Sequence, residues 1–146
     1  MPSFHDPLDR ASFESRVRAL TPNAKRQWGT MSPDQMLWHI NQALAMNLGR
    51  ATGEMMRIPI PRALMKMVAL YLPWPKGAPT APAFKARRAY DFAAEQRQCL
   101  ELIGATAAKP LDAEWGTHVA FGKLTGKQAS RLSALHLDHH LRQFGA

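Results

Sequence analysis

The sequence lacks most of the features that mark secreted, membrane-spanning or disulfide-linked proteins. Cys99 is its one cysteine, so no disulfide can form within the chain. The first residues have neither the basic start nor the apolar core of a secretory signal. The longest apolar stretch, residues 63–75, is interrupted by Lys66 and is shorter than the roughly 20 residues that a membrane span needs. We therefore expect a soluble, cytoplasmic protein with no membrane span.

Zinc-finger spacings, RNP-like aromatic motifs and glycine-rich phosphate loops are also missing. Acidic residues are scarce, and the net charge is +8. Most of the excess lies between residues 50 and 90, where Glu54 is the one acidic residue against eight basic ones. Such a segment could attract a small anionic molecule, a nucleic acid or an anionic membrane, or it could be an ordinary solvated face. With no motif to support it, nucleic acid is not the partner that we expect.

Strand patterns are nearly absent, whereas helix patterns recur along the 146 residues. The predicted helices cover about residues 9–20, 32–48, 62–72, 88–107 and 125–144, and residues 115–124 are predicted to form a connecting loop. Ser32 and Gln35 form a capping box, as do Thr125 and Gln128, and Gly49 is typical of the position after a helix. We expect one domain over residues 1–146, an all-α four-helix bundle with an extra short helix and long proline-rich connections.

Three of the six histidines fall within five residues of the last predicted helix. Each helical residue advances by about 100°, so His136 and His140 project from one face, one turn apart. Their Cβ atoms are then about 5–6 Å apart, which lets both rings reach one metal ion. His139 lies about 60° from His136 around the helix and cannot replace either ring.

His39 occupies the apolar face of the predicted helix 32–48, together with Met36 and Ile40. A histidine in such a place could be a hydrogen-bonded core residue. Three inward imidazoles without partners would, however, be costly to bury, and one divalent metal would satisfy all of them. The sequence therefore predicts a metal site formed by His39, His136 and His140, in which zinc or nickel suits imidazole nitrogen.

Other residues have weaker predictions. Gln143 lies one turn beyond His140 and could orient a ligand ring, and His139 could shuttle protons, although a packing role is the simpler expectation for it. His118 could approach the site from its loop, and we expect His5 to be exposed or disordered. Cys99 is expected to be a small buried apolar residue.

The short helix near residues 62–72 is apolar on most sides, so we expect it to pack against the bundle or a second subunit. A role at a membrane surface, suggested by Arg62 and Lys66, ranks below dimerisation because the helix is short. Trp74 could form part of a pocket wall or cover the end of the bundle.

Four stretches, residues 26–46, 72–82, 121–126 and 136–145, resemble the DinB-like (YfiT-like) superfamily of metal-binding four-helix bundles, and in particular a bacterial branch of unknown function. In that superfamily a histidine from the second helix and a His-x-x-x-His pair from the last helix bind one divalent metal. The resemblance implies His39, His136 and His140 as ligands, an antiparallel bundle and a homodimer. Relatives include thiol S-transferases, but no thiol-binding motif of theirs is matched here.

Two functions follow from these patterns. One is a metal-dependent enzyme, a thiol S-transferase or hydrolase, in which a three-histidine metal activates a small thiol or water and the basic segment holds an anionic substrate. The other is a non-enzymatic protein that binds an anionic ligand or nucleic acid and keeps a vestigial metal site. A helical interaction protein with metal-free histidines is a third alternative.

Overall fold

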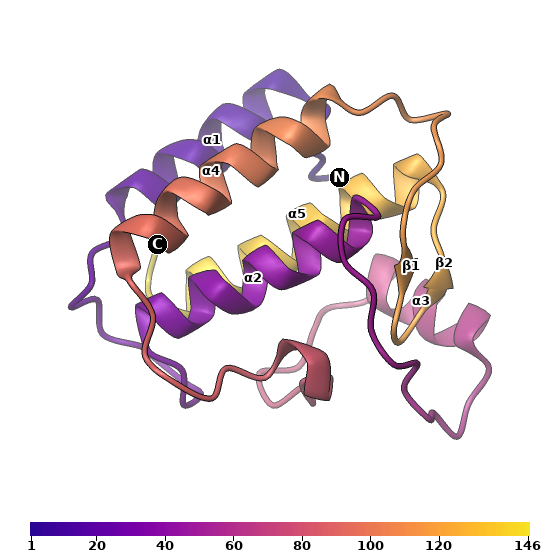
Figure 1. Cartoon of the computed structure of the whole chain (residues 1–146), viewed down its shortest axis with the longest axis horizontal. Helices are drawn as coiled ribbons and strands as arrows, with labels where there is room; N and C mark the ends of the chain where they lie inside the picture. The colour runs from indigo at the N-terminus through magenta and orange to yellow at the C-terminus, as the bar shows by residue number, and fades with distance from the viewer.

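The computed structural model describes residues 1–146, and its four long helices form the expected bundle (Figure 1). The elements are α1 (Pro7–Ala19), α2 (Pro33–Asn47), α3 (Arg62–Tyr71), the 3-10 turn η1 (Pro82–Phe84), α4 (Phe92–Ala108), β1 (Thr117–His118), β2 (Gly122–Lys123) and α5 (Gly126–Gln143). Both α1 and α2 pack against α4 and α5, which closes a ring of four helices. The extra short helix, α3, packs on α5.

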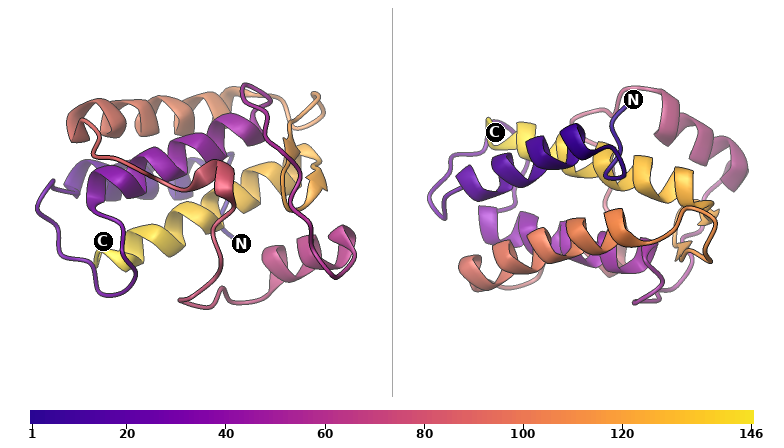
Figure 2. Two further views of the ribbon diagram at one scale, coloured as in Figure 1. Left: turned by 60° about the horizontal axis from the view of Figure 1, so that its bottom comes forward. Right: turned by 90° about the horizontal axis from the view of Figure 1, so that it is seen from above.

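The long connection from α2 to α4 determines how the helices run. In Figure 1, α1 and α5 run in one direction and α2 and α4 in the other, so the pairs α1–α4 and α2–α5 are antiparallel. The chain leaves α2 at one end of the bundle, forms α3, and returns to the opposite end before α4 begins (Figure 2). This return lays η1 against α2. The proline-rich segment therefore becomes one wall of the space between α2 and α5.

Local sequence signals account for most of the helix ends. Both predicted capping boxes are present, at Ser32 and Thr125, and Gly49 has the positive φ of 80° that ends a helix favourably. The α4 helix begins at Phe92, four residues later than the predicted start, because the Asp91 side chain accepts the Ala94 N–H and caps the helix there.

Two other expectations were wrong. The loop predicted at residues 115–124 contains a small antiparallel hairpin, in which β1 pairs with β2. His5 is half-buried rather than exposed or disordered, because its Nε2 donates to the Lys109 carbonyl and its Nδ1 contacts Ser130 Oγ at 2.8 Å. The His5 contacts join residues more than 100 positions apart, which no local pattern indicates, whereas the hairpin is local but too short to give a strand pattern. No helix is long and apolar enough to cross a membrane.

Candidate metal centre

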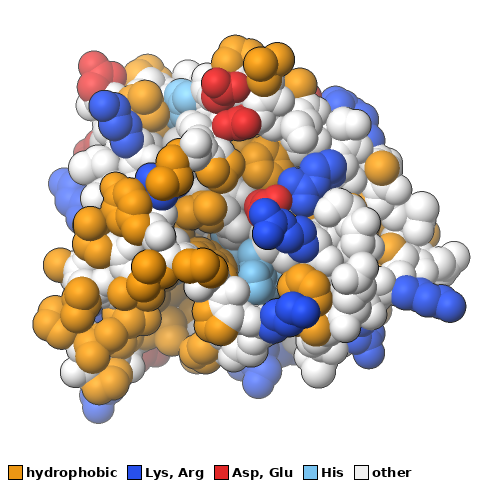
Figure 3. Space-filling model, turned by 180° about the vertical axis from the view of Figure 1, so that it is seen from behind, with side chains coloured by type: hydrophobic (Ala, Val, Ile, Leu, Met, Phe, Trp, Pro, Cys, Tyr) orange, Lys and Arg blue, Asp and Glu red, His pale blue; other side chains and the backbone are white.

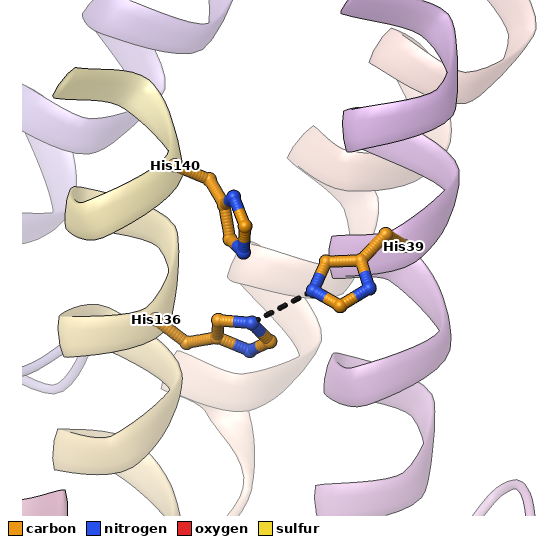
Figure 4. A group of neighbouring side chains, drawn as sticks. All are labelled: His39, His136 and His140. Carbon is orange, nitrogen blue, oxygen red and sulfur yellow. Dashed lines mark hydrogen bonds between the residues drawn. The ribbon is translucent and has the colours of Figure 1, made fainter. Parts of the chain in front are cut away.

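The two facing helices α2 and α5 bring three histidines together between them (Figure 4). His39 projects from α2 and is 3% exposed, while His140 projects from α5 and is 8% exposed. His136 lies one turn before His140 and is partly exposed. The helical spacing that placed His136 and His140 on one inward face is therefore found in the structure.

The three rings form a nearly equilateral group. Ring centroids are 4.8 Å apart for His39 and His136, 4.7 Å for His39 and His140, and 4.9 Å for His136 and His140. One nitrogen from each ring lies within 4.8 Å of the other two. The closest pair, Nε2 of His39 and Nε2 of His136, is separated by 2.9 Å (Figure 4).

The orientation of the His39 ring is fixed by the returning proline-rich segment. Nδ1 of His39 lies 2.8 Å from the carbonyl oxygen of Phe84. A carbonyl oxygen only accepts hydrogen bonds, so Nδ1 carries the proton. The lone pair of the neutral ring is therefore on Nε2, which points toward α5.

A relay of two hydrogen bonds fixes the His140 ring in the same way. The Gln143 amide Nε2 donates to the Trp28 carbonyl over 2.8 Å, which turns its Oε1 toward Nδ1 of His140, 2.9 Å away. That oxygen can only accept, so Nδ1 of His140 is protonated and its Nε2 lone pair is free. Gln143 is 4% exposed, so water does not compete strongly for either bond.

Gly29 leaves the space that this relay needs. A Cβ atom at position 29 would lie 2.1 Å from Nε2 of Gln143. Gly29 also has a φ of +84°, a backbone conformation that residues other than glycine rarely adopt. Any larger residue at position 29 would displace the amide that orients His140.

Burial keeps the three rings neutral. It lowers the pKa of His39, lowers the pKa of His140 to about 3, and holds the pKa of His136 well below its ordinary value. The neighbouring imidazoles lower the pKa of His136 and His140 further, because two adjacent cations would repel each other. Neutral imidazole is the form that binds metal ions.

The donor set fits a small divalent ion. Ligand nitrogens about 2.0–2.1 Å from a tetrahedral zinc are separated from one another by roughly 3.4 Å. In the histidine group the nitrogen–nitrogen separations run from 2.9 Å to at most 4.8 Å, so the separation required by zinc lies within this range. Two of the three rings also have the carbonyl or amide acceptor on Nδ1 that metal-binding histidines usually have. Small rotations of the side chains would complete such a site.

The remaining titratable candidates lie beside this group and not in it. His139 is half-buried between Trp28 and Trp74, with its ring 5.1 Å from that of His140. His118 is buried against Phe121, and its Nδ1 accepts the Ala120 N–H.

Cys99 is fully buried, as expected, and burial raises the pKa of its thiol to about 12. This thiol is therefore not a nucleophile.

A groove of about 680 Å³ adjoins the histidines on the outer side of α5. Trp28, Trp74 and His139 line it, and Lys76 and Arg142 lie at its rim. Trp74 is shared between the groove and the cluster, since its ring centroid is 5.3 Å from that of His136 and 5.7 Å from that of His139. Figure 3 shows histidine atoms in a hollow with apolar side chains on one side and basic ones on the other.

No local sequence pattern indicates the parts of the site that depend on long-range contacts. The Phe84 carbonyl lies 45 residues from His39 along the chain, and the Trp28 carbonyl lies 115 residues from Gln143. The predicted contact between Gln143 and His140 is present. The sequence did not predict that the Trp28 carbonyl and the space at Gly29 would orient the Gln143 amide.

The fold and the cluster define a helical-bundle protein with a group of three histidines that could hold a metal ion. A family model described as "Protein of unknown function (DUF1569)" matches residues 4–146, so the chain belongs to this family. No curated protein and no solved structure gives a significant match.

Proposed function

We propose that the protein binds one divalent metal ion through His39, His136 and His140 and acts as a metal-dependent transferase or hydrolase of the DinB-like type. The observation that carries the proposal is the pair of fixed tautomers: Phe84 and Gln143 hold His39 and His140 with their Nε2 lone pairs toward a common point. Metal binding would replace the proton that His136 Nε2 shares with His39 Nε2, 2.9 Å away, so that all three rings could present a lone pair to the ion. Zinc and nickel both suit an all-imidazole site.

Three histidines leave a coordination position open, which is typical of catalytic rather than structural zinc sites. An ion held in this way lowers the pKa of a water molecule or thiol that reaches it, and so supplies a nucleophile near neutral pH. The protein's own part is to orient the ligands through Phe84 and Gln143 and to shield one side of the site with the Trp74 ring.

The groove beside His139 supports a small anionic substrate, such as an anionic thiol. The Lys76 ammonium lies over the Trp28 ring, 4.8 Å from its centroid, and forms no ion pair with a carboxylate. Asp138 pairs with both Arg16 and Arg142, so its carboxylate is neutralised at the groove and Lys76 remains without an acidic partner. An anion with a flat apolar portion would meet both tryptophans and these cations.

The alternative, a basic protein that binds nucleic acid, has less support. Arg62 and Lys66, two of the eight cations in the basic segment, donate to backbone carbonyls of Val119 and Lys123, so part of this positive charge is engaged within the protein.

The test is elemental analysis of the purified protein after incubation with zinc or nickel and removal of free metal. We expect about one ion per chain in the wild type and a loss of bound metal in His39→Ala and His136→Ala. His139→Ala is the matched control, because it removes the neighbouring ring and leaves the three ligands in place. Wild-type protein without bound metal would overturn the proposal, and metal-free protein with full thiol-transfer or hydrolytic activity would overturn its enzymatic part.

A further inference from the structure

The α3 helix exposes an apolar stripe to solvent. The members of the stripe follow the i, i+3, i+4, i+7 spacing of one helix face: Leu64, Met67, Val68 and Tyr71. Their side chains are between 39% and 54% exposed. Ala69 and Leu70, which lie on another side of the helix, are buried. The stripe is therefore not the side by which α3 is attached to the bundle.

This exposure is concentrated in one part of the chain. Of the ten large hydrophobic side chains that are exposed, seven lie between residues 55 and 72: Met55, Ile60, Leu64, Met67, Val68, Tyr71 and Leu72. We call these seven residues the α3 patch. Figure 3 shows apolar side chains gathered over one side of the molecule. A patch of this kind marks an interaction surface, whereas single exposed hydrophobic residues are ordinary.

Two arginines border the α3 patch. Arg131 of α5 places its guanidinium carbon 4.2 Å from the centroid of the Tyr71 ring. Its Nε is buried without an acceptor, and the side chain forms no ion pair. Arg57 is exposed, lies between Met55 and Ile60 in the chain, and forms no ion pair either. Both guanidinium groups can therefore bind an anion beside the apolar side chains.

The segments around the patch contain no carboxylate that could neutralise these cations. Between residues 55 and 90 every aspartate and glutamate is missing, and the same is true of residues 115–137, which include the hairpin and the part of α5 that carries Arg131. The α3 helix packs on α5, and Lys66 donates to the Lys123 carbonyl of the hairpin. Dimerisation through this patch would bring two sets of cations together, which like-charge repulsion disfavours.

We infer that the α3 patch is a docking surface for an anionic lipid bilayer. A helix that lies in the membrane interface buries its apolar side chains among the acyl chains, while cations at its edge meet the lipid phosphates. The ten residues of α3 extend about 15 Å, which suffices to lie along a membrane and is too short to cross it. Tyr71, with an apolar ring and a polar hydroxyl, suits the level of the head groups.

An acidic protein would meet the same cations, but the shape of the patch favours lipid. Leu64, Met67 and Val68 project from the surface of a helix, and a fluid acyl phase accommodates them without a complementary groove. Leu72 also lines the groove beside His139, so docking holds the edge of that groove next to the membrane. The inference does not depend on metal binding.

The experiment is co-sedimentation with phosphatidylcholine vesicles that contain or lack phosphatidylserine. We expect the wild type to bind the phosphatidylserine vesicles and to bind less as salt is raised, because salt screens exposed charges. Leu64→Gln/Met67→Gln keeps the net charge and should lower the partition coefficient at least about tenfold. Arg131→Gln should lower it about fivefold, the effect of one basic residue near a charged membrane surface.

The matched controls lie on α1, at the opposite side of the molecule from α3 (Figure 1). Leu8→Gln changes an 83% exposed leucine and Arg18→Gln removes an exposed charge, and both should bind as the wild type does. Circular dichroism checks that each variant keeps its helices.

Four results would overturn the inference. The first is a wild type that does not bind phosphatidylserine vesicles at low salt. The second is binding that Leu64→Gln/Met67→Gln does not weaken, because the contact would then lie elsewhere. The third is equal affinity for soluble polyglutamate, lost in the same variants, which would assign the patch to an acidic protein. The fourth is a dimer that this double variant dissociates, together with no vesicle binding.

Discussion

Two regions of the molecule depart from the ordinary arrangement, in which apolar side chains are buried and polar ones face solvent. Between α2 and α5 the protein gathers three imidazoles, of which His39 and His140 are buried and His136 is partly buried. On α3 it exposes a stripe of leucine, methionine, valine and tyrosine and turns an arginine and a lysine inward. Each arrangement is unfavourable for the isolated chain, because buried polar groups need partners and exposed apolar surface remains in water.

The difference lies in the partner that would compensate each region. The Nε2 atoms of His39 and His140 have lone pairs that converge, which suits a cation, whereas the exposed stripe of α3, which consists of Leu64, Met67, Val68 and Tyr71, is almost entirely apolar. The histidine group is therefore suited to a small ligand of defined geometry, and the exposed side of α3 is suited to another apolar surface.

Adding metal should have the largest effect on the first region. A ligand present at about a thousand times its dissociation constant stabilises the folded state by about 4.1 kcal/mol. For a chain of this length we expect a rise in Tm of roughly 10 °C with zinc or nickel. Thermal scans with and without metal measure it; the shift should persist in His139→Ala and vanish in His136→Ala. Equal shifts in the two variants would show that the ion binds elsewhere.

Buried imidazole should also make the metal-free protein sensitive to acid. Burial lowers the pKa of His118 from 6.5 to about 4, so between these values the unfolded chain binds more protons than the folded one. The contribution of His118 to stability is therefore complete above pH 6.5 and is lost as the pH falls toward 4, by about 3 kcal/mol.

Urea unfolding at several pH values measures this loss. His118→Asn, whose amide oxygen can still accept the Ala120 N–H, should lose less stability over the same range. Because His118 also lowers the pKa of His136, the difference reports the burial of His118 together with its repulsion of a protonated His136. Identical pH profiles would contradict the prediction.

Removing the acceptor that orients His140 should weaken metal binding without removing a ligand. Loss of such supporting contacts typically costs ten- to a hundredfold in metal affinity, so we expect that range for Gln143→Leu. Gln143→Glu keeps an oxygen for His140 Nδ1 and should retain more affinity. Competition with a chromophoric chelator gives both dissociation constants. An unchanged affinity in Gln143→Leu would mean that the tautomer of His140 is set by something other than Gln143.

The smallest effect is expected at the exposed end of α3. Leu72→Ala should change the free energy of unfolding by no more than about 0.5 kcal/mol, because Leu72 is 57% exposed. The same change at Leu132, which is 2% exposed, should cost about 2–5 kcal/mol. Urea unfolding of the two variants compares the regions directly. Similar losses would show that α3 is packed like the core.

Local signals in the sequence predicted the four-helix bundle and the capped starts of α2 and α5. They also placed His39, His136 and His140 on inward faces, because helical periodicity and capping depend on neighbours within one turn. The reversed packing of α3 could not be predicted in this way. Its periodicity marks an apolar stripe but does not say whether that stripe faces the bundle, and two of the three carbonyl partners of Arg62 lie 57 and 58 residues away.

X-ray absorption spectroscopy of the zinc-loaded protein tests the central claim most directly, because it reports the atoms bound to the ion. The account predicts three imidazole nitrogens at about 2.0–2.1 Å, with the multiple scattering of histidine rings and no sulfur neighbour. His39→Ala should lower the imidazole count, and His139→Ala should leave it unchanged. A spectrum with oxygen neighbours alone, or with sulfur from Cys99, would contradict the three-histidine site.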